Sequence, residues 1–256
     1  MRRYLDALLT LAALIAAWVL VIEWFKVPNY ILPTPRAVLH ALKIGYVDGV
    51  YWPHLWATFK ATSIGYLLGC GLAFVVGSLA ADSRTFERFV YPYVVGLQSM
   101  PKVALAPLVI VWFGFGIESK IVLVALICFF PLFVNTVTGI RSTDPDLLDL
   151  MRVFGRSRLD ILLQVKLPHA ATPIMAGMQI GVVLGLIGAV AAEFVASTRG
   201  LGFVIQNAAN ALNLGAMFAA LFSLAAIGIA GTQLLRLAQR KLVFWDRTSG
   251  ADVKTA

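Results

Sequence analysis

Charged residues are scarce in this sequence. Asp, Glu, Lys and Arg make up 13% of its 256 residues, whereas a soluble domain carries roughly 25%. Hydrophobic residues make up 60%, and several uncharged runs are long enough to cross a bilayer, which predicts an integral membrane protein. The net charge of +8 therefore does not indicate nucleic-acid binding, because basic residues of membrane proteins collect on the cytoplasmic side.

Residues suited to disulfides, metal binding or phosphate chemistry are also few. Cys70 and Cys128 lie inside apolar runs, where buried small side chains are expected rather than a disulfide or a metal site. The sequence has no His/Cys cluster with metal-ligand spacing and no glycine-rich loop ending in Lys-Ser or Lys-Thr. We therefore expect no catalytic residue, metal or cofactor in this chain, so that any ATP chemistry must come from another protein.

Six segments are predicted to span the membrane. A spanning helix needs about 20 apolar residues, and the predicted spans are 5–25, 57–80, 86–114, 119–140, 170–195 and 217–239. The third is punctuated by three prolines and by Lys102, so we expect a broken helix that faces protein or a water-filled cavity. The first lacks a clear small-residue cleavage site and is predicted to be retained. The predicted fold is an all-α polytopic membrane protein, with residues 1–256 forming one transmembrane domain.

The distribution of Lys and Arg predicts the orientation of these spans. With the N-terminus inside, the outer side holds only Lys26, Arg36, Lys43, Lys120 and Arg199, and Lys60 and Lys102 fall in or near spans. The inner side holds the other basic residues, namely Arg2, Arg3, Arg84, Arg88, Arg141, Arg152, Arg156, Arg158, Lys166, Arg236, Arg240, Lys241, Arg247 and Lys254. This bias predicts that both termini and the loop 141–168 are cytoplasmic.

The loop 141–168 is predicted to form two short helices. Asp144 caps the first, with Pro145 at its first position, and Gly155 ends it in a left-handed conformation. Ser157 starts the second with Asp160 in a capping-box arrangement, and Pro168 is expected to mark the turn into the fifth span. Two interpretations remain open: an amphipathic surface helix on anionic lipid, or a docking element whose apolar face fills a groove on a cytoplasmic partner.

The same loop resembles the cytoplasmic motif of bacterial ABC importer permeases: Glu-Ala-Ala, three residues, Gly, nine residues, Ile-x-Leu-Pro. Gly155 and the pair Leu167-Pro168 match in identity and spacing, whereas Leu150 and Met151 replace the two alanines. The resemblance implies that this loop docks on an ATPase subunit. The implied coupling residues are Asp149, Leu150, Met151, Phe154, Gly155, Arg156, Leu167 and Pro168.

Three further segments resemble the nitrate, sulfonate and taurine branch of these permeases. They are "VPNYILPTPRAVLHAL" (27–42), "MPKVALAPLVIVWFGFG" (100–116) and "AAEFVASTRGLGFVI" (191–205). They occur in the family's order within the six-span frame. The resemblance therefore implies the type I importer permease fold.

The resemblance also implies a function and a set of partners. The chain would form the pore of an ATP-driven importer in a bacterial inner membrane as a homodimer, with two ATPase subunits that bind ATP and Mg. A solute-binding protein would deliver substrate to the outer loops 27–56 and 197–214. The branch implies a small anion such as a sulfonate, taurine or nitrate. The alternatives are a vitamin precursor carried by the same class of transporter, or an ion-coupled secondary transporter.

Several residues are candidates for the pore or its gate, and for each a structural role stays open. Pro101 marks either a simple kink or a pore-lining bend, which the charge of Lys102 favours. Glu193 is either a structural counter-ion, for instance of Arg199, or a gate residue, and the glycines around Leu201 serve either a tight turn or a gate. The pore and gate candidates are Met100, Pro101, Lys102, Glu193, Leu201 and Gly202.

Glycines recur on one face of the fifth span, in Gly177-x-x-x-Gly181-x-x-x-Gly185. Such a stripe lets helices approach closely. Both a dimer seam and packing within the chain are compatible with the sequence.

Overall fold

The computed structural model describes residues 2–245, and within this range every regular element is helical. The predicted inner residues Arg247 and Lys254 lie outside the described residues. The elements are α1 (Arg2–Phe25), α2 (Pro35–Val47), α3 (Trp52–Asp82), α4 (Arg84–Gln98), η1 (Lys102–Leu105), α5 (Ala106–Phe113), α6 (Ile117–Arg141), α7 (Pro145–Val153), α8 (Arg158–Ile161), η2 (Leu162–Lys166), α9 (Leu167–Ala196), α10 (Leu201–Asn210) and α11 (Leu214–Leu242).

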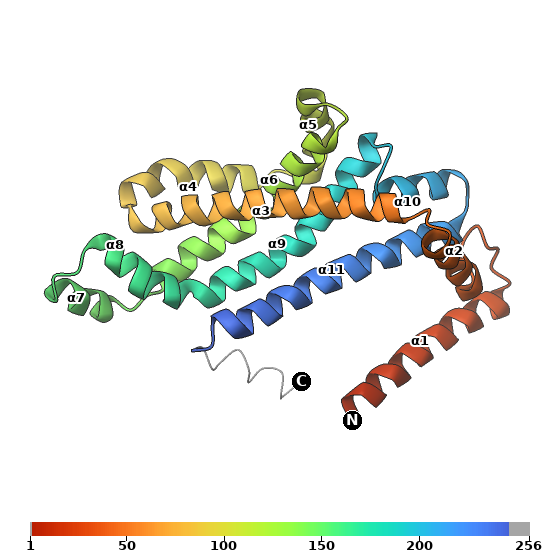
Figure 1. The fold of residues 1–256 in the computed structure, drawn as a ribbon, viewed down its shortest axis with the longest axis horizontal. Coiled ribbons are helices and arrows are strands. Elements are labelled where there is room, and N and C mark those ends of the chain that lie inside the picture. Colours follow the sequence, from red (N-terminus) through yellow and green to blue (C-terminus); the bar gives the residue numbers. More distant parts are fainter. Residues whose placement is uncertain (1, 246–256) are drawn as a thin grey trace.

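Five helical stretches of the described chain are long and apolar enough to cross a membrane. They are Leu8–Phe25, α3, α6, Arg158–Val195 and α11. A sixth crossing results if the bent pair Thr85–Gln98 and Lys102–Phe113 counts as one span. In Figure 1 the short helices α7 and α8 lie at one end of the long helices, and α2 and α10 lie at the other.

Helices α3, α6 and α9 pack most extensively and form the centre of the molecule. Gly65 of α3 faces Val124 of α6, and Gly77 faces Thr136, so these two helices run in the same direction. On α9, Gly177 lies against Leu132 and Asn135 whereas Gly188 lies against Ile127, so α9 runs opposite to α6. Because α3 and α6 run in the same direction, the bent α4–α5 segment between them must return the chain to the end of the bundle where α3 began.

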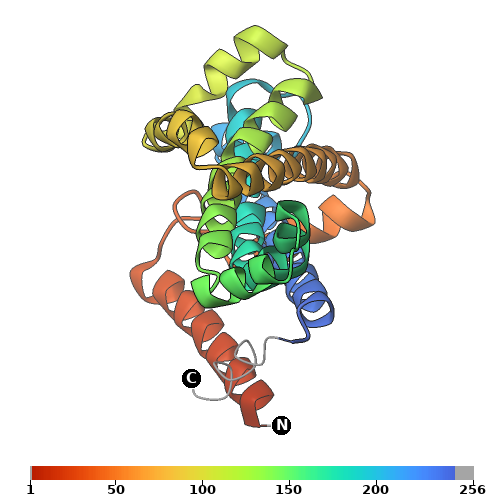
Figure 2. The same cartoon turned by 90° about the vertical axis from the view of Figure 1, so that its left-hand side faces the viewer.

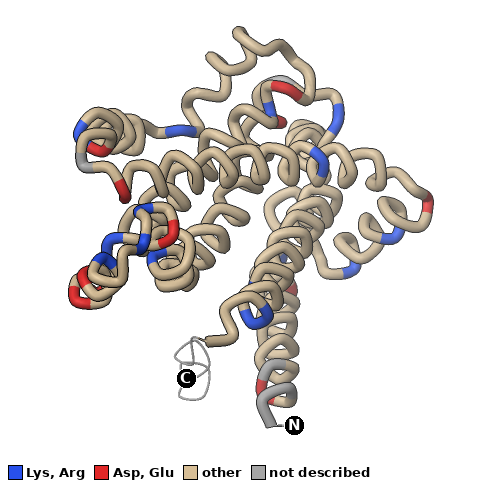
Figure 3. Tube along the Cα trace, turned by 60° about the vertical axis from the view of Figure 1, so that its left-hand side comes forward, with Lys and Arg blue, Asp and Glu red and all other residues tan. Residues whose placement is uncertain are grey.

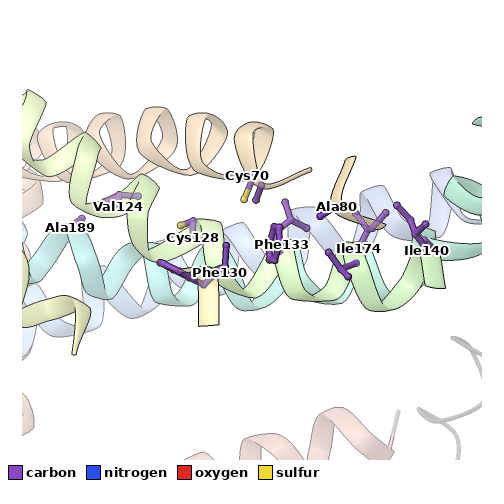
Figure 4. Close-up of a cluster of buried hydrophobic side chains, with 14 residues drawn as sticks. Cys70, Ala80, Val124, Cys128, Phe130, Phe133, Ile140, Ile174 and Ala189 are labelled. Atoms are coloured by element: carbon purple, nitrogen blue, oxygen red, sulfur yellow. The ribbon is translucent and has the colours of Figure 1, made fainter. Parts of the chain in front are cut away.

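The glycine stripe of the fifth span packs within the chain. A Cβ atom at Gly177 would meet the α6 backbone at Leu132 at 3.1 Å, and one at Gly185 would meet Sγ of Cys128 at 2.7 Å. The absence of side chains here allows the backbones of α6 and α9 to approach closely. Around this contact lies the main core cluster, which includes Cys70, Cys128 and Phe133 (Figure 4).

Helix α1 lies apart from the other helices. Figures 1 and 2 both show it diverging from the bundle, on the side opposite α5. Its side chains are largely exposed, and its aromatic contact with the rest of the chain joins Trp18 to Phe218 of α11, with ring centroids 6.0 Å apart. An apolar helix with so little internal packing is suited to contact lipid or another protein chain.

The predicted break of the third span occurs at Pro101, where the axes of the two halves meet at 90°. Pro101 has extended backbone angles and precedes η1. Pro92 lies inside α4 without ending it, and Pro107 lies in the first turn of α5, where the missing N–H removes no intrahelical bond. Of the three prolines, therefore, only Pro101 marks the sharp bend.

Candidate functional site

Helix α7 is a short, sharply bounded helix at one end of the bundle. The Asp144 carboxylate accepts a hydrogen bond from the Asp146 N–H at 2.9 Å, and Pro145 follows the cap. At the other end Gly155 has a φ of 69°. Its N–H donates to the carbonyl oxygen of Arg152, and the N–H of Arg156 donates to that of Met151, which is the hydrogen-bond pattern of a Schellman motif. Both predicted caps of this helix are confirmed.

The side chains of α7 form an exposed apolar surface. No residue of α7 is buried, and Phe154 at its end is 71% exposed. Asp149 and Arg152 form an ion pair on the surface of the helix. Other exposed apolar side chains of this segment are Leu147, Leu150 and Val153 of α7, with Leu159 and Leu163 beyond the turn. Apolar side chains in this arrangement, flanked by arginines, are suited to fill a groove on another protein.

The segment after Gly155 differs from the predicted second short helix. The capping box of Ser157 and Asp160 is present, with hydrogen bonds in both directions. However, α8 continues through the π-turn η2 into α9 with no non-helical residue at Pro168. The prediction of a turn at Pro168 was wrong. The N–H of Leu167 bonds to Leu162, five residues back, so the helix has already left α-helical pairing where the proline ring enters it.

Two ion pairs fasten this end of the bundle. Lys166 of η2 reaches Asp82 at the end of α3, with Nζ 2.6 Å from Oδ1, and Arg141 at the end of α6 pairs with Glu87 of α4. Figure 3 shows positions of Lys or Arg and of Asp or Glu gathered at the α7–α8 end, while long uncharged stretches run through the helices. α7 thus lies between two elements that are tied to the spans.

The eight predicted coupling residues fall into two groups. Asp149, Leu150, Met151, Phe154, Gly155 and Arg156 lie on α7 or its C-terminal cap. Leu167 instead packs against the main core cluster, and the Pro168 carbonyl accepts a hydrogen bond from Nε1 of Trp245 at 3.3 Å. The first group belongs to an accessible surface, whereas the last two residues hold the base of α9.

A second site surrounds the bend at Pro101. Lys102 lies in η1, and its ammonium donates a hydrogen bond to the Gln98 carbonyl at 3.0 Å and lies 4.6 Å from the centroid of the Phe130 ring. A cavity of about 390 Å³ is lined by these three residues and by apolar side chains of α6 and α9. Met100 is half exposed beside it. Phe130 is near the middle of α6, so Lys102 lies at mid-depth of the bundle rather than at its edge.

A buried polar cluster lies at the other end, where α9 meets α10. The Glu193 side chain is fully buried and accepts hydrogen bonds from the Thr58 hydroxyl at 2.9 Å and from the Gly202 N–H at 2.8 Å. Its Oε1 lies 3.6 Å from Nζ of Lys120, which also donates to the carbonyl of Arg199 at 2.7 Å. The cation that pairs with Glu193 is therefore Lys120, and Arg199 contributes a backbone oxygen.

This cluster explains the glycines of the STRGLG segment. Gly200 has a φ of 138°, and a Cβ atom there would lie 2.1 Å from the Glu193 carboxylate. A Cβ at Gly202 would lie 2.8 Å from that of Glu193. Leu201 between them is fully buried in a cluster with Ile205 and Leu224. In this chain Leu201 is a core residue, and its predicted role as a gate stays a prediction.

The predicted pore and gate residues therefore do not form a single site. Lys102 contacts Phe130 whereas Glu193 contacts Lys120, ten residues and about 15 Å earlier along α6. Thr58 and Lys120 were missed from the sequence as site residues. Lys120 was expected on the outer side, at the edge of the predicted span 119–140, but it is buried in α6. A lysine at the edge of an apolar run is typical of a span boundary, and no local pattern links it to Glu193.

Comparison with known proteins places these features in one family. The family model described as "Binding-protein-dependent transport system inner membrane component" matches residues 73–244. The chain is 35% identical to the riboflavin transport system permease protein RibX of Chloroflexus aurantiacus, over 93% of this chain and 88% of the relative. It is 32% identical to the taurine transport system permease protein TauC of Escherichia coli, over 92% and 88%.

Solved structures show the same fold. The chain is similar to a chain of the inward-facing MetNI methionine ABC transporter, with a TM-score of 0.62 and 17% identity. The match covers 74% of this chain and 98% of the other. At this identity the likeness establishes the fold, that of a type I importer permease.

Proposed function

The chain belongs to the family of binding-protein-dependent transport system inner membrane components, and from this premise we propose that it forms the translocation pore of an ATP-driven importer. Two copies would form the pore, and two ATPase subunits, which bind ATP and Mg, would dock on the α7 surface. A solute-binding protein would meet α2 and α10 at the opposite end. The chain itself contributes no ATP-hydrolysing site.

The α7 surface is the observation that carries this proposal. Its apolar side chains are exposed although its two ends are fixed by caps, so the helix is rigid but lacks a cover within the described chain. Lipid is a poorer alternative cover, because α7 carries Asp146 and Asp149 against a single arginine, Arg152, and so lacks the basic excess that binds anionic headgroups. A protein groove with its own charges meets both the apolar and the acidic side chains.

The continuous helix from Arg158 to Ala196 supports a mechanical role for this surface. α8, η2 and α9 follow one another without a break, so a displacement of α7 is passed through Gly155 to a rod that crosses the membrane. Lys166 ties the same rod to α3. Closure of two ATPase subunits would thereby pull on α9 and α3 together and change the opening of the pore.

The orientation that this function requires follows from the basic residues. The α7–α8 end carries Arg152, Arg156, Arg158 and Lys166, and this excess of Lys and Arg supports a cytoplasmic position for this end and for both termini. The end with α2 and α10 then faces outward, where a solute-binding protein delivers substrate.

The substrate belongs to the range that the relatives' names cover. TauC is named for taurine, a small sulfonate, and RibX is named for riboflavin. We propose a small anion of the sulfonate type, with a vitamin or vitamin precursor as the alternative.

The test of this function is a bulky substitution at Gly155. Gly155→Leu is expected to abolish ATP-driven uptake while membrane insertion is retained, because leucine is strained at a φ of 69° and the end of α7 must change shape. Uptake into proteoliposomes that contain the permease, its ATPase and its binding protein is the measurement.

A matched control is available on the opposite side of the membrane. Gly114 has a φ of 82° and, like Gly155, has open space where a Cβ atom would lie, so Gly114→Leu imposes similar strain away from α7 and away from the loops 27–56 and 197–214. It should retain most of the uptake, and Gly155→Asn should retain more than Gly155→Leu, because Asn tolerates left-handed angles. Normal uptake by Gly155→Leu, or uptake driven by an ion gradient without the ATPase, would contradict the proposed function.

A further inference from the structure

The cations packed among the spans differ in how their charge is balanced. Lys120, Arg141 and Lys166 each pair with a carboxylate, those of Glu193, Glu87 and Asp82. Lys102 instead contacts a backbone carbonyl and an aromatic ring, and within residues 2–245 no carboxylate lies within ion-pair distance of it. Its positive charge is thus left available.

The depth of Lys102 makes this unbalanced charge costly. The residues of α6 around its cavity are Ile127, Phe130 and Pro131, near the middle of a helix that runs from 117 to 141. Those of α9 include Ile180 and Leu184, also near the middle of their helix. A lone cation at this depth costs several kcal/mol or more unless it faces water or a partner. An uncompensated lysine at this depth therefore requires a partner from outside the described chain or access to water.

The cavity restricts what that partner is. Its volume of about 390 Å³ falls within the range of small-molecule sites. Lys102 is the one charged side chain among its lining residues, Gln98 is the other hydrophilic one, and the remaining walls are apolar or aromatic. One ammonium group balances one negative charge, whereas the apolar walls suit a short carbon chain or ring. The chemistry fits an organic monoanion better than a multiply charged phosphate or a neutral polar solute.

We propose that Lys102, at the Pro101 bend, is an anion contact midway along the translocation path, and that it selects substrates with a singly charged sulfonate-like headgroup and an apolar body. This proposal rests on the pore function proposed above and deepens it. Lys102 is held for the role by Gln98 and Phe130: the hydrogen bond fixes the ammonium, while the ring face stabilises the positive charge in the empty site.

The test measures anion access to the cavity without requiring transport. A reporter cysteine is placed at Ile180, which lines the cavity and is 48% exposed. The reporter variant is then treated in membrane vesicles with three methanethiosulfonate reagents: anionic sulfonatoethyl, cationic trimethylammonioethyl and neutral methyl. The unmodified chain gives the background, because Cys70 and Cys128 are both buried.

The expected result is a preference for the sulfonate reagent that depends on Lys102. With Ile180→Cys alone, the sulfonatoethyl reagent should react faster relative to the trimethylammonioethyl reagent than it does with a free thiol. Adding Lys102→Gln should lower this rate ratio by at least about tenfold, since a unit charge within several ångströms changes the local anion concentration by this much even at an effective dielectric constant near 20. Lys102→Arg should preserve the ratio.

Two controls make the outcome decisive. Lys60→Gln removes the same charge from an exposed position of α3 that does not line the cavity, and it should leave the ratio unchanged. The neutral reagent must react at the same rate in all variants, which shows that the cavity itself is intact; if Lys102→Gln changes that rate, Lys102→Met in the same background is compared instead. An unchanged ratio in both Lys102 variants, or an equal fall with Lys60→Gln, overturns the proposal.

The two proposals fail separately. ATP-dependent uptake by the wild-type complex with no effect of Lys102 on the reagent ratio would retain the pore function and reject the anion contact. A Lys102-dependent ratio in a chain that neither binds an ATPase nor transports with ATP would reject the pore function of an ATP-driven importer and leave the anion site standing.

Discussion

The two ends of this molecule differ in where their charged residues lie. At the α7 end, apolar side chains are exposed and the charged pair Asp149–Arg152 lies on the surface. At the α10 end, the charged pair Lys120–Glu193 is buried and surrounded by hydrogen-bond partners. The first arrangement leaves a surface that we propose another protein covers, whereas the second is complete within the described chain. The difference separates the proposed docking element from a contact that stabilises the chain internally.

A single substitution should have the largest effect on stability in the buried Lys120–Glu193 pair. Glu193→Ala leaves Lys120 buried without a counter-charge and removes the acceptor for Thr58 and Gly202. Breaking a buried ion pair from one side costs about 3–5 kcal/mol. Thermal unfolding of the purified protein in detergent should show a correspondingly lower midpoint. For contrast, Asp149→Ala at the exposed pair should change the unfolding free energy by about 1 kcal/mol or less.

A double substitution sharpens this comparison. Glu193→Ala combined with Lys120→Met removes both charges and should regain part of the lost stability. Glu193→Gln should fall between the wild type and Glu193→Ala, since an amide still accepts a hydrogen bond. If Glu193→Ala unfolds at the wild-type temperature, the buried pair does not fasten α10 to the spans.

The smallest expected effect is a pH dependence at the start of α8. Hydrogen bonds from the Ser157 hydroxyl and backbone N–H lower the pKa of Asp160 below its ordinary value of 3.8. The folded cap therefore gains stability that is fully present above pH 3.8 and is lost as the pH falls through the lower folded value. Hydrogen exchange of residues 157–162, corrected for its intrinsic pH dependence, should rise a few-fold on acidification.

Asp160→Asn supplies the control for this prediction. The variant should show the faster exchange already at neutral pH and no further rise with acid. Equal exchange of residues 157–162 in the wild type and in Asp160→Asn at neutral pH would show that the capping box does not hold this segment.

The sequence predicted the α7 end better than the α10 end, and the reason is the range of the interactions. Asp144, Gly155 and Ser157 act on residues within five positions along the chain, so rules for helix caps identify them. The bend at Pro101 follows from local rules in the same way. The six-span, all-α fold could be predicted because the positions of charged residues and the lengths of the apolar runs alone separate the spans.

Rules for helix caps and apolar length do not predict contacts between segments that are distant in the sequence. Glu193 contacts Thr58 and Lys120, which are 135 and 73 positions away in the sequence. No residue spacing within a single sequence predicts contacts over such distances. The glycine stripe was identified, but the choice between a dimer seam and the α6 contact depended on which helix lies opposite. Pro168 was assigned a turn because the π-turn that accommodates it leaves no trace in the residue pattern.

The most direct test of the account is retention of the ATPase subunit by a permease with an altered α7 surface. Phe154→Asp places a charge within the exposed apolar surface without touching the core, because Phe154 is 71% exposed. We predict that the variant inserts normally and unfolds at the wild-type temperature but loses at least about tenfold in ATPase affinity, as for an interface anchor worth about 1.4 kcal/mol or more. Full retention of the ATPase by this variant would contradict the assignment of α7 as the docking element.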